Sequence, residues 1–373
     1  MNPLLFRAFR ALETKVHELN YLFWECTTRC NLACRHCGSD CFKSSKDKDM
    51  PLEDFLKALD TIPKDYLKKL RSAKYKDGKQ SPFVVILTGG EPLLRPDIED
   101  IGKAITERGL AWSMVSNGFF YNADMHRRLI GAGMKALTIS LDGLENEHNW
   151  MRGNPNSYRN AIDAIAIAAK EKRLDFDVVS CINKQNIKQL EQIYSILSEL
   201  GVKQWRLFTI IPIGRAAAEP LFHLESAETK QLMEFIKEKR EAAERLKNNS
   251  LQAQSMEVTF SCEGYLAGYE QKVRPAPHFC RAGINIGSIL IDGTICACPN
   301  VDREVFGQGN IYRDNFYKVW ESKFEPFRNR NWARRGECSH CKQFKNCLGE
   351  GMHNWHDSCQ APLNCHYNKL IDD

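Results

Sequence analysis

Three closely spaced cysteines are the residues of this chain with the clearest chemical capability. Cys30, Cys34 and Cys37 follow a C-x3-C-x2-C pattern. Thiolates at this spacing can bind one iron–sulfur cube, which needs four ligands. Three cysteines therefore leave one iron open to another molecule. The pattern predicts a metal cluster with a second ligand bound directly to it.

A structural zinc site, or part of a disulfide framework, is the alternative reading of these cysteines. Structural zinc takes four cysteine or histidine ligands. His36 or Cys41 could supply the fourth ligand, so the spacing alone does not exclude zinc. A second motif, Gly-Gly-Glu-Pro at residues 89–92, weighs against zinc because it points to another family of sites.

Together the two motifs resemble the radical S-adenosylmethionine (SAM) superfamily. In that family SAM binds the open iron, and reductive cleavage of SAM releases a radical that abstracts hydrogen from a substrate. The cofactor supplies this chemistry, and the protein orients and shields it. The resemblance implies a [4Fe–4S] cluster on Cys30, Cys34 and Cys37, with SAM as the second cofactor.

The same resemblance implies several SAM-binding residues. Gly89, Gly90 and Glu91 match the segment that meets the amino group of SAM, and the glycines permit a tight backbone turn and close approach to a ligand. Ser140 and Arg152 match a Ser-Leu-Asp-Gly…Arg-Gly pattern of peptide-modifying members. There the serine and arginine approach the ribose and carboxylate of SAM, a use that suits a guanidinium group.

Two further residues complete the expected SAM site. Asn117 follows a predicted strand, and a turn role is an equal explanation for it because asparagine and aspartate favour turns. For Asp142 and Asn183 the turn role is the favoured explanation. His36 stands where the family often has an aromatic residue beside the adenine. A loop histidine in water is the alternative for His36.

Alternating apolar runs and helical patterns must position these residues. Uninterrupted apolar strands are typical of parallel sheets buried on both faces. Six strands are predicted, at residues 21–25, 83–87, 111–115, 136–141, 176–182 and 204–211. Helices are predicted between them at 52–67, 97–108, 124–132, 157–170 and 187–200. Right-handed crossovers in this order curl into a barrel whose functional groups follow the strands.

The chain is therefore expected to be an α/β protein: a partial (β/α)6 TIM-like barrel with a small cysteine-rich α+β domain at its C-terminal end. We expect an N-terminal helix at 1–20, the barrel at 21–225, a solvated bridging helix and linker at 226–260, and the second domain at 261–373. The N-terminal helix carries Phe6, Phe9 and Leu12 with Arg7 and Arg10. It is predicted to pack on the protein body, with a membrane or partner contact as the alternative.

The cysteines of the second half resemble the SPASM extension, which carries auxiliary iron–sulfur clusters. One predicted [4Fe–4S] cube has four ligands: Cys338, Cys341, Cys347 and Cys365. Another has three: Cys280, Cys298 and Cys359. Metal ligands would replace part of a hydrophobic core in such a domain. A zinc-ribbon pattern is the alternative here.

The likeness to SPASM fails at one position, because Gly351 stands where the pattern has another cysteine. The second cube is then left with an open position, or with Cys262 or Cys296 as its fourth ligand. The number of auxiliary clusters is thus one or two. The remaining unmatched cysteines are expected to act as small buried hydrophobic residues; they are Cys26, Cys41 and Cys181.

Composition limits the cellular context. The 373 residues carry a net charge of +5, which is far from the concentrated excess of a nucleic-acid-binding protein. No run of eighteen apolar residues is present, so we expect no stable membrane insertion and a cytoplasmic protein. In a reducing cytosol, fifteen cysteines serve metals or catalysis rather than disulfides.

The resemblance implies a radical SAM oxidoreductase that acts as a peptide-modifying maturase, because SPASM extensions accompany peptide and protein modification. Its partners would be a peptide or protein substrate and an electron donor such as a ferredoxin or flavodoxin. The chain also resembles the group described for radical SAM/lipoprotein systems. Pro299 and Asn300 replace the base of sulfatase-maturing members, so the catalytic base is not assigned; Asp302 and Glu263 are candidates.

Two other functions remain open from the sequence. One is a radical SAM dehydrogenase of a small alcohol or carbohydrate, since such enzymes also carry SPASM extensions. The other is a zinc-binding module without catalysis.

Overall fold

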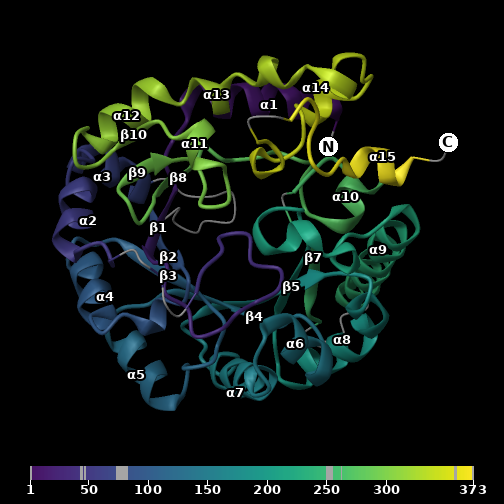
Figure 1. The fold of residues 1–373 in the computed structure, drawn as a ribbon, viewed down its shortest axis with the longest axis horizontal. Helices are drawn as coiled ribbons and strands as arrows, with labels where there is room; N and C mark the ends of the chain where they lie inside the picture. The colour runs from purple at the N-terminus through teal and green to yellow at the C-terminus, as the bar shows by residue number, and fades with distance from the viewer. Residues whose placement is uncertain are drawn as a thin grey trace.

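A computed structural model describes residues 2–42, 45, 48–72, 83–248, 255–261, 263–356 and 359–371. Cys262, a candidate cluster ligand, lies outside these residues. In the described part, ten strands form one sheet in the order β10-β9-β8-β1-β2-β3-β4-β5-β6-β7. The sheet curves around the centre of the molecule with helices on its outer side (Figure 1).

The six predicted parallel strands are confirmed. They are β1 (Tyr21–Thr27), β2 (Val84–Gly89), β3 (Ala111–Ser116), β4 (Ala136–Ser140), β5 (Asp175–Ile182) and β6 (Gln204–Thr209). Each pairs in parallel with the next along the chain. Buried tryptophans fill the space between this sheet and its helices: Trp24, Trp112 and Trp205. The carboxyl ends of the strands therefore meet at one mouth of the partial barrel.

The connecting helices are α2 (Leu52–Leu59), α3 (Lys64–Ser72), α4 (Ile98–Glu107), α5 (Ala123–Gly131), α6 (Glu145–Arg152), α7 (Ser157–Ala168) and α8 (Leu190–Glu199). The single helix predicted over 52–67 was wrong, since α2 ends before Pro63 and α3 begins after it. Proline disfavours helical backbone in the residue before it, which explains the break. Helix α6 was not predicted.

The second half of the chain extends both edges of the same sheet. Strand β7 (Glu257–Phe260) pairs in parallel with β6, and β8 (Ile286–Ile289) pairs in parallel with β1. Strands β9 (Thr294–Cys296) and β10 (Gly309–Asn310) follow in antiparallel pairs. Short helices complete this half: α10 (Glu270–Val273), α11 (Arg303–Phe306), α12 (Phe316–Lys323), α13 (Glu325–Arg328), α14 (Phe344–Cys347) and α15 (His366–Leu370). The predicted α/β partial barrel with a C-terminal domain is thus confirmed.

Helix α9 (Ser226–Asn248) differs from the solvated bridge that was expected. Its residues Leu232, Met233 and Ile236 are fully buried. They lie on a helix that contacts β7, α10 and α15. An apolar face packed on a sheet edge, with charged residues on the other side, is the usual arrangement of a surface helix.

The N-terminal helix α1 (Pro3–Val16) packs on the protein body, as predicted, and lies beside α14. Phe6 and Arg10 are buried, whereas Leu4, Leu5 and Leu12 are exposed. No helix within the described ranges is long and apolar enough to cross a membrane.

Candidate active site

The cysteine loop leaves the end of β1 and folds back at the mouth of the barrel. Cys30 and Cys34 are buried and Cys37 is half-buried, and the three residues share one cluster of side chains. The Cys30 backbone N–H donates to the Phe42 carbonyl at 3.1 Å, which closes the loop. Burial raises the pKa of Cys30 to about 12, and the neighbouring Cys34 and Cys37 thiols act in the same direction. The three predicted ligands are therefore close together.

Arg215, which the sequence reasoning missed, holds this loop in place. Its Nε donates to the Cys34 carbonyl at 2.7 Å, and its backbone N–H donates to the Cys37 carbonyl at 3.1 Å. The preceding Gly214 has φ +55°, and an added Cβ would lie 2.5 Å from the Cys37 carbonyl oxygen. The signal in the sequence was a Gly-Arg pair a few residues after the sixth strand.

Gly89 and Gly90 also pack against the cysteine loop. The Gly90 N–H donates to the Thr27 carbonyl at 2.7 Å, and the Glu91 N–H donates to the Arg29 carbonyl at 2.9 Å. A Cβ would lie 2.0 Å from the Thr27 oxygen at Gly89 and 2.1 Å from the Arg29 oxygen at Gly90. The sequence predicted that these glycines let the backbone approach a ligand closely. In the structure, they let it approach the backbone of the cysteine loop.

Glu91 is fully buried and joins β2 to β3. Its carboxylate accepts hydrogen bonds from the Ser116 hydroxyl at 2.9 Å and the Asn117 N–H at 2.8 Å. Burial raises the pKa of Glu91 to about 6. The Asn117 amide donates to Asn31 at 2.9 Å and lies 3.9 Å from the Cys30 sulfur. The Asn117 side chain therefore reaches the cysteine loop.

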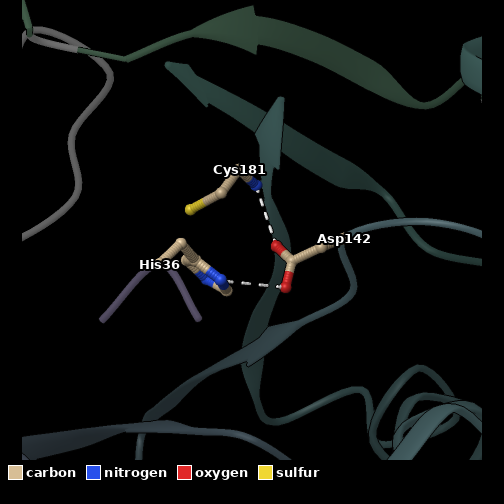
Figure 2. A group of neighbouring side chains, drawn as sticks. All are labelled: His36, Asp142 and Cys181. Carbon is tan, nitrogen blue, oxygen red and sulfur yellow. Dashed lines mark hydrogen bonds and ion pairs between the residues drawn. The ribbon is translucent and has the colours of Figure 1, made fainter. Parts of the chain in front are cut away.

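Asp142 lies between His36 and Cys181 (Figure 2) and also contacts the predicted site residue Arg152. It is completely buried, and its carboxylate accepts from Arg152 Nε at 2.6 Å and from the Cys181 N–H at 2.9 Å. His36 Nε2 lies 3.9 Å from the same carboxylate. Burial opposes ionisation, but Arg152 and then His36 hold the pKa of Asp142 below its ordinary value. Asp142, read from the sequence as an ordinary turn residue, is the centre of this group.

The unpredicted helix α6 places Arg152 at the cysteine loop. Arg152 Nη1 lies 3.7 Å from the Cys34 sulfur. Gly153 ends the helix with φ +64°, and a Cβ there would lie 2.8 Å from the Ala33 carbonyl oxygen. His148, on the same helix, accepts the Asp142 N–H at 3.0 Å through Nδ1. Burial is the main cause that lowers the pKa of His148 to about 3, so the ring is neutral.

His36 is not a solvated loop histidine, because only 9% of its side chain is exposed. Burial lowers its pKa to about 4, and its ring meets the ring of Phe222 edge-on at 6.0 Å. Cys181 is half-buried beside His36 and Asp142, which differs from the inert burial expected of it. Ser140 is half-buried at the end of β4, and its predicted contact with SAM stays a prediction.

The four cysteines assigned to one auxiliary cube lie near one another. Cys365 acts electrostatically on Cys347, and Cys338 and Cys341 act on Cys365. Burial raises the pKa of Cys365 to about 12. The Glu350 N–H donates to the Cys347 sulfur at 3.0 Å.

The three cysteines assigned to a second cube are placed less compactly. Cys280 lines a small cavity together with Cys347. The Cys359 N–H donates to the carbonyl of His356. The His356 ring in turn contacts Asp302, four residues after Cys298, which places Cys359 in the same region as Cys298. The thiol of Cys296 is buried in the core and donates to the Phe306 carbonyl at 3.5 Å. This contact disfavours Cys296 as the fourth ligand of the second cube.

Among the described residues, the group of metal-binding side chains with all ligand atoms within 4.8 Å is His36, Asp142 and Cys181. The assignment of the three cysteine sets to clusters stays a prediction.

A cavity of about 450 Å³ lies between the cysteine loop and the C-terminal half. That volume is within the range of small-molecule sites. Its walls come from the cysteine loop, from the segment after β6 and from residues 299–303 with His356. Substrate held there would lie beside the loop that carries the predicted SAM-binding cluster.

Comparison with known proteins identifies two domains in this chain. Residues 24–197 match the radical SAM superfamily, and residues 280–342 match the iron–sulfur cluster-binding SPASM domain. The chain carries a radical SAM domain followed by a SPASM domain. SAM and [4Fe–4S] clusters are the cofactors that these domains indicate.

Relatives of this radical SAM chain differ in their named activities. AdoMet-dependent heme synthase of Nitratidesulfovibrio vulgaris is 22% identical over 91% of this chain and 89% of its own length. Mycofactocin maturase MftC of Mycolicibacterium smegmatis is 28% identical over 89% of this chain and 77% of its own length.

Solved structures show the same fold. Streptococcus suis SuiB bound to the precursor peptide SuiA superposes with a TM-score of 0.66 at 15% identity, covering 93% of this chain and 76% of SuiB. The structure titled anSMEcpe with bound AdoMet and Cp18Cys peptide gives 0.66 at 17% identity, covering 94% of both chains.

Proposed function

We propose that this radical SAM enzyme modifies a side chain or backbone position of a peptide or protein. Support comes from the MftC relatives and from the shared fold with SuiB and anSMEcpe, both of which have been crystallised with peptides. The observation within the chain that carries the proposal is the 450 Å³ cavity beside the cysteine loop.

We assign the SAM-binding cluster to Cys30, Cys34 and Cys37, with Arg152 and Asn117 reaching the same loop. When bound, the cluster and SAM supply the radical that abstracts hydrogen from the substrate. The protein's own contribution is to hold the loop rigid through Arg215 and Gly90 and to keep water from the cluster through burial. A ferredoxin or flavodoxin in a reducing cytoplasm is the proposed electron donor.

The charges lining the cavity favour a substrate of low net charge, such as a peptide segment. Asp40 accepts from Arg215 at 2.8 Å, and Arg303 pairs with the buried Glu25 at 3.0 Å. Each of these charges is already compensated within the chain. The described part of the cavity wall is therefore polar but close to neutral, which matches the amide groups of a peptide better than the carboxylates of a polyanion.

Asp302 and His356 also line the cavity, with Asp302 Oδ2 2.9 Å from His356 Nδ1. This pair is the best-placed acceptor for a substrate proton in the cavity. The other sequence candidate, Glu263, is buried and accepts both the N–H and the hydroxyl of Thr209, at 3.0 and 2.6 Å. Glu263 is therefore occupied in joining β6 to the C-terminal half.

A tetrapyrrole substrate is the second candidate. The heme synthase relatives, and the Fe-coproporphyrin III synthase of Methanosarcina barkeri at 23% identity over 87% of this chain, favour it. Among the described lining residues, the arginine that could bind a porphyrin carboxylate is Arg303, and its pairing with Glu25 weighs against this substrate.

Both candidates can be tested with anaerobically purified protein that is reconstituted with iron and sulfide and reduced with dithionite. Formation of 5′-deoxyadenosine shows SAM cleavage, and the triple variant C30A/C34A/C37A should abolish it while auxiliary iron remains. Mass spectrometry of co-expressed peptides and of iron-coproporphyrin incubated with the enzyme then separates the substrates. A mass change of the porphyrin and of no peptide would refute the proposal.

A further inference from the structure

Two buried arginines, Arg10 in the N-terminal helix α1 and Arg330 in the C-terminal half, lack a carboxylate partner in the described part of the chain. Arg10 and Arg330 are each only 7% exposed, and within the described ranges neither forms an ion pair. Arg10 donates to the Asn346 and Lys345 carbonyls at 2.7 and 2.6 Å. Arg330 donates to the Glu350 carbonyl at 3.1 Å, and its Nε has no hydrogen-bond partner in the described structure. Uncompensated buried charges are costly, so an anion is expected nearby.

Two predicted cluster ligands face these arginines. Arg10, Arg330, Cys280 and Cys347 line the same small cavity. Cysteines bind a cluster as thiolates, so a cluster on these residues would bring negative charge to the side of the cavity opposite the guanidinium groups.

The nearest buried carboxylate does not take this role. Glu350 lines the cavity as well, but its carboxylate lies 3.1 Å from His366 Nδ1. His366 Nε2 lies 3.5 Å from the carboxylate of Glu263, so the ring bridges the two carboxylates and Glu350 is already engaged. His278 lines the same cavity, and neither of its ring nitrogens has a partner in the described part of the chain.

We propose that Arg10 and Arg330 are the charge partners of the auxiliary cluster bound through Cys347, and that they raise its reduction potential. Net charge and hydrogen bonding around a cluster set its potential. A nearby cation stabilises the reduced form because that form carries one more electron. Since Arg10 belongs to α1, the N-terminal helix forms part of the wall around this cluster.

A purely structural role is the competing explanation. Both guanidinium groups contact carbonyls in or just after α14, where cations stabilise a helix end. Such a role would affect folding but would leave the potential of a retained cluster unchanged. The inference depends on the assigned auxiliary ligands and is independent of the substrate, so failure to modify a peptide would not alter it.

The test uses the full-length C30A/C34A/C37A protein, in which auxiliary clusters alone contribute to the signal. Potentiometric titration followed by electron paramagnetic resonance measures the potential, and iron analysis measures occupancy. R10M and R330M should each shift the redox equilibrium at least tenfold toward the oxidised form, about 59 mV for one electron. R10K keeps the charge and should stay close to the parent.

Arg7 provides the matched control, because it lies on the same helix and donates to the Asn346 side chain at 2.7 Å. R7M should shift the potential less than R10M. If R10M loses its iron while R10K retains it, the requirement for charge is supported. Unchanged potentials in R10M and R330M at full occupancy would overturn the proposal, as would equal shifts or equal iron loss in R10M and R10K.

Discussion

Replacing Gly90 by alanine should displace the cysteine loop and greatly reduce SAM cleavage. The added Cβ would lie 2.1 Å from the Arg29 carbonyl oxygen, and Cβ contacts below 3.0 Å are essentially never seen. The neighbouring atoms are backbone on both sides, so no flexible side chain can move away. The loop must therefore move by roughly 1 Å, a displacement that can cost about a hundredfold in rate.

The assay for G90A compares 5′-deoxyadenosine formation per assembled cluster with that of the parent enzyme under dithionite. Iron content is measured in parallel, because a displaced loop could also fail to retain the cluster. The matched control is G131A, since a Cβ at Gly131 in α5 meets no atom within 4 Å. G131A should keep full activity and gain up to about 1 kcal/mol of stability from improved helix propensity. Parental activity and iron content in G90A would refute the reasoning about the loop.

Two further predictions concern the buried charges of the site, and both are measured by denaturant unfolding without oxygen. D142N leaves the buried Arg152 unpaired and should lower the free energy of unfolding by about 3–5 kcal/mol, whereas D124N, which breaks an exposed pair with Arg127 at 2.8 Å, should cost less than about 1 kcal/mol. Equal losses in the two variants would contradict the buried pairing. Burial raises the pKa of Glu91 from 4.5 to about 6. The folded protein therefore binds this proton more tightly than the unfolded chain does. The contribution of Glu91 to the free energy of unfolding is fully present below pH 4.5 and is lost as the pH rises through about 6. Relative to E91Q, the free energy of unfolding of the parent should fall by roughly 2 kcal/mol between pH 4 and pH 7. If the difference in unfolding free energy between the two proteins did not change with pH, this prediction would be wrong.

Local sequence was sufficient for the elements with strong periodicity. The buried parallel strands are continuous apolar runs in the sequence, and all six were predicted from these runs. Short polar elements give no such signal. Helix α6 has the sequence ENEHNWMR over Glu145–Arg152, with few apolar residues to mark a face, and it was missed although it carries Arg152 and His148. Proline at position 63 divided a helix that periodicity had joined.

Roles that depend on long-range contacts were harder to foresee. Asp142 follows a strand like many turn aspartates, and its importance emerges from partners on three other segments: His36, Arg152 and Cys181. Arg215 reaches the Cys34 carbonyl across 181 residues of sequence, and Arg10 reaches that of Asn346 across 336. The residues next to an arginine in the sequence do not predict which carbonyl its side chain will bind.

By itself, the sequence determined the chemistry available to this protein, because the C-x3-C-x2-C spacing and the Gly-Gly-Glu motif specify ligands within a few residues of one another. It also determined where the six central strands lie, since each apolar run is local. Tertiary structure alone decided how these ligands are supported. Backbone contacts from Gly90 and Arg215 hold the cysteine loop, and Arg10 and Arg330 bring positive charge to Cys347. The physical reason is that steric fit and charge compensation depend on distances in space, which the folded sheet sets.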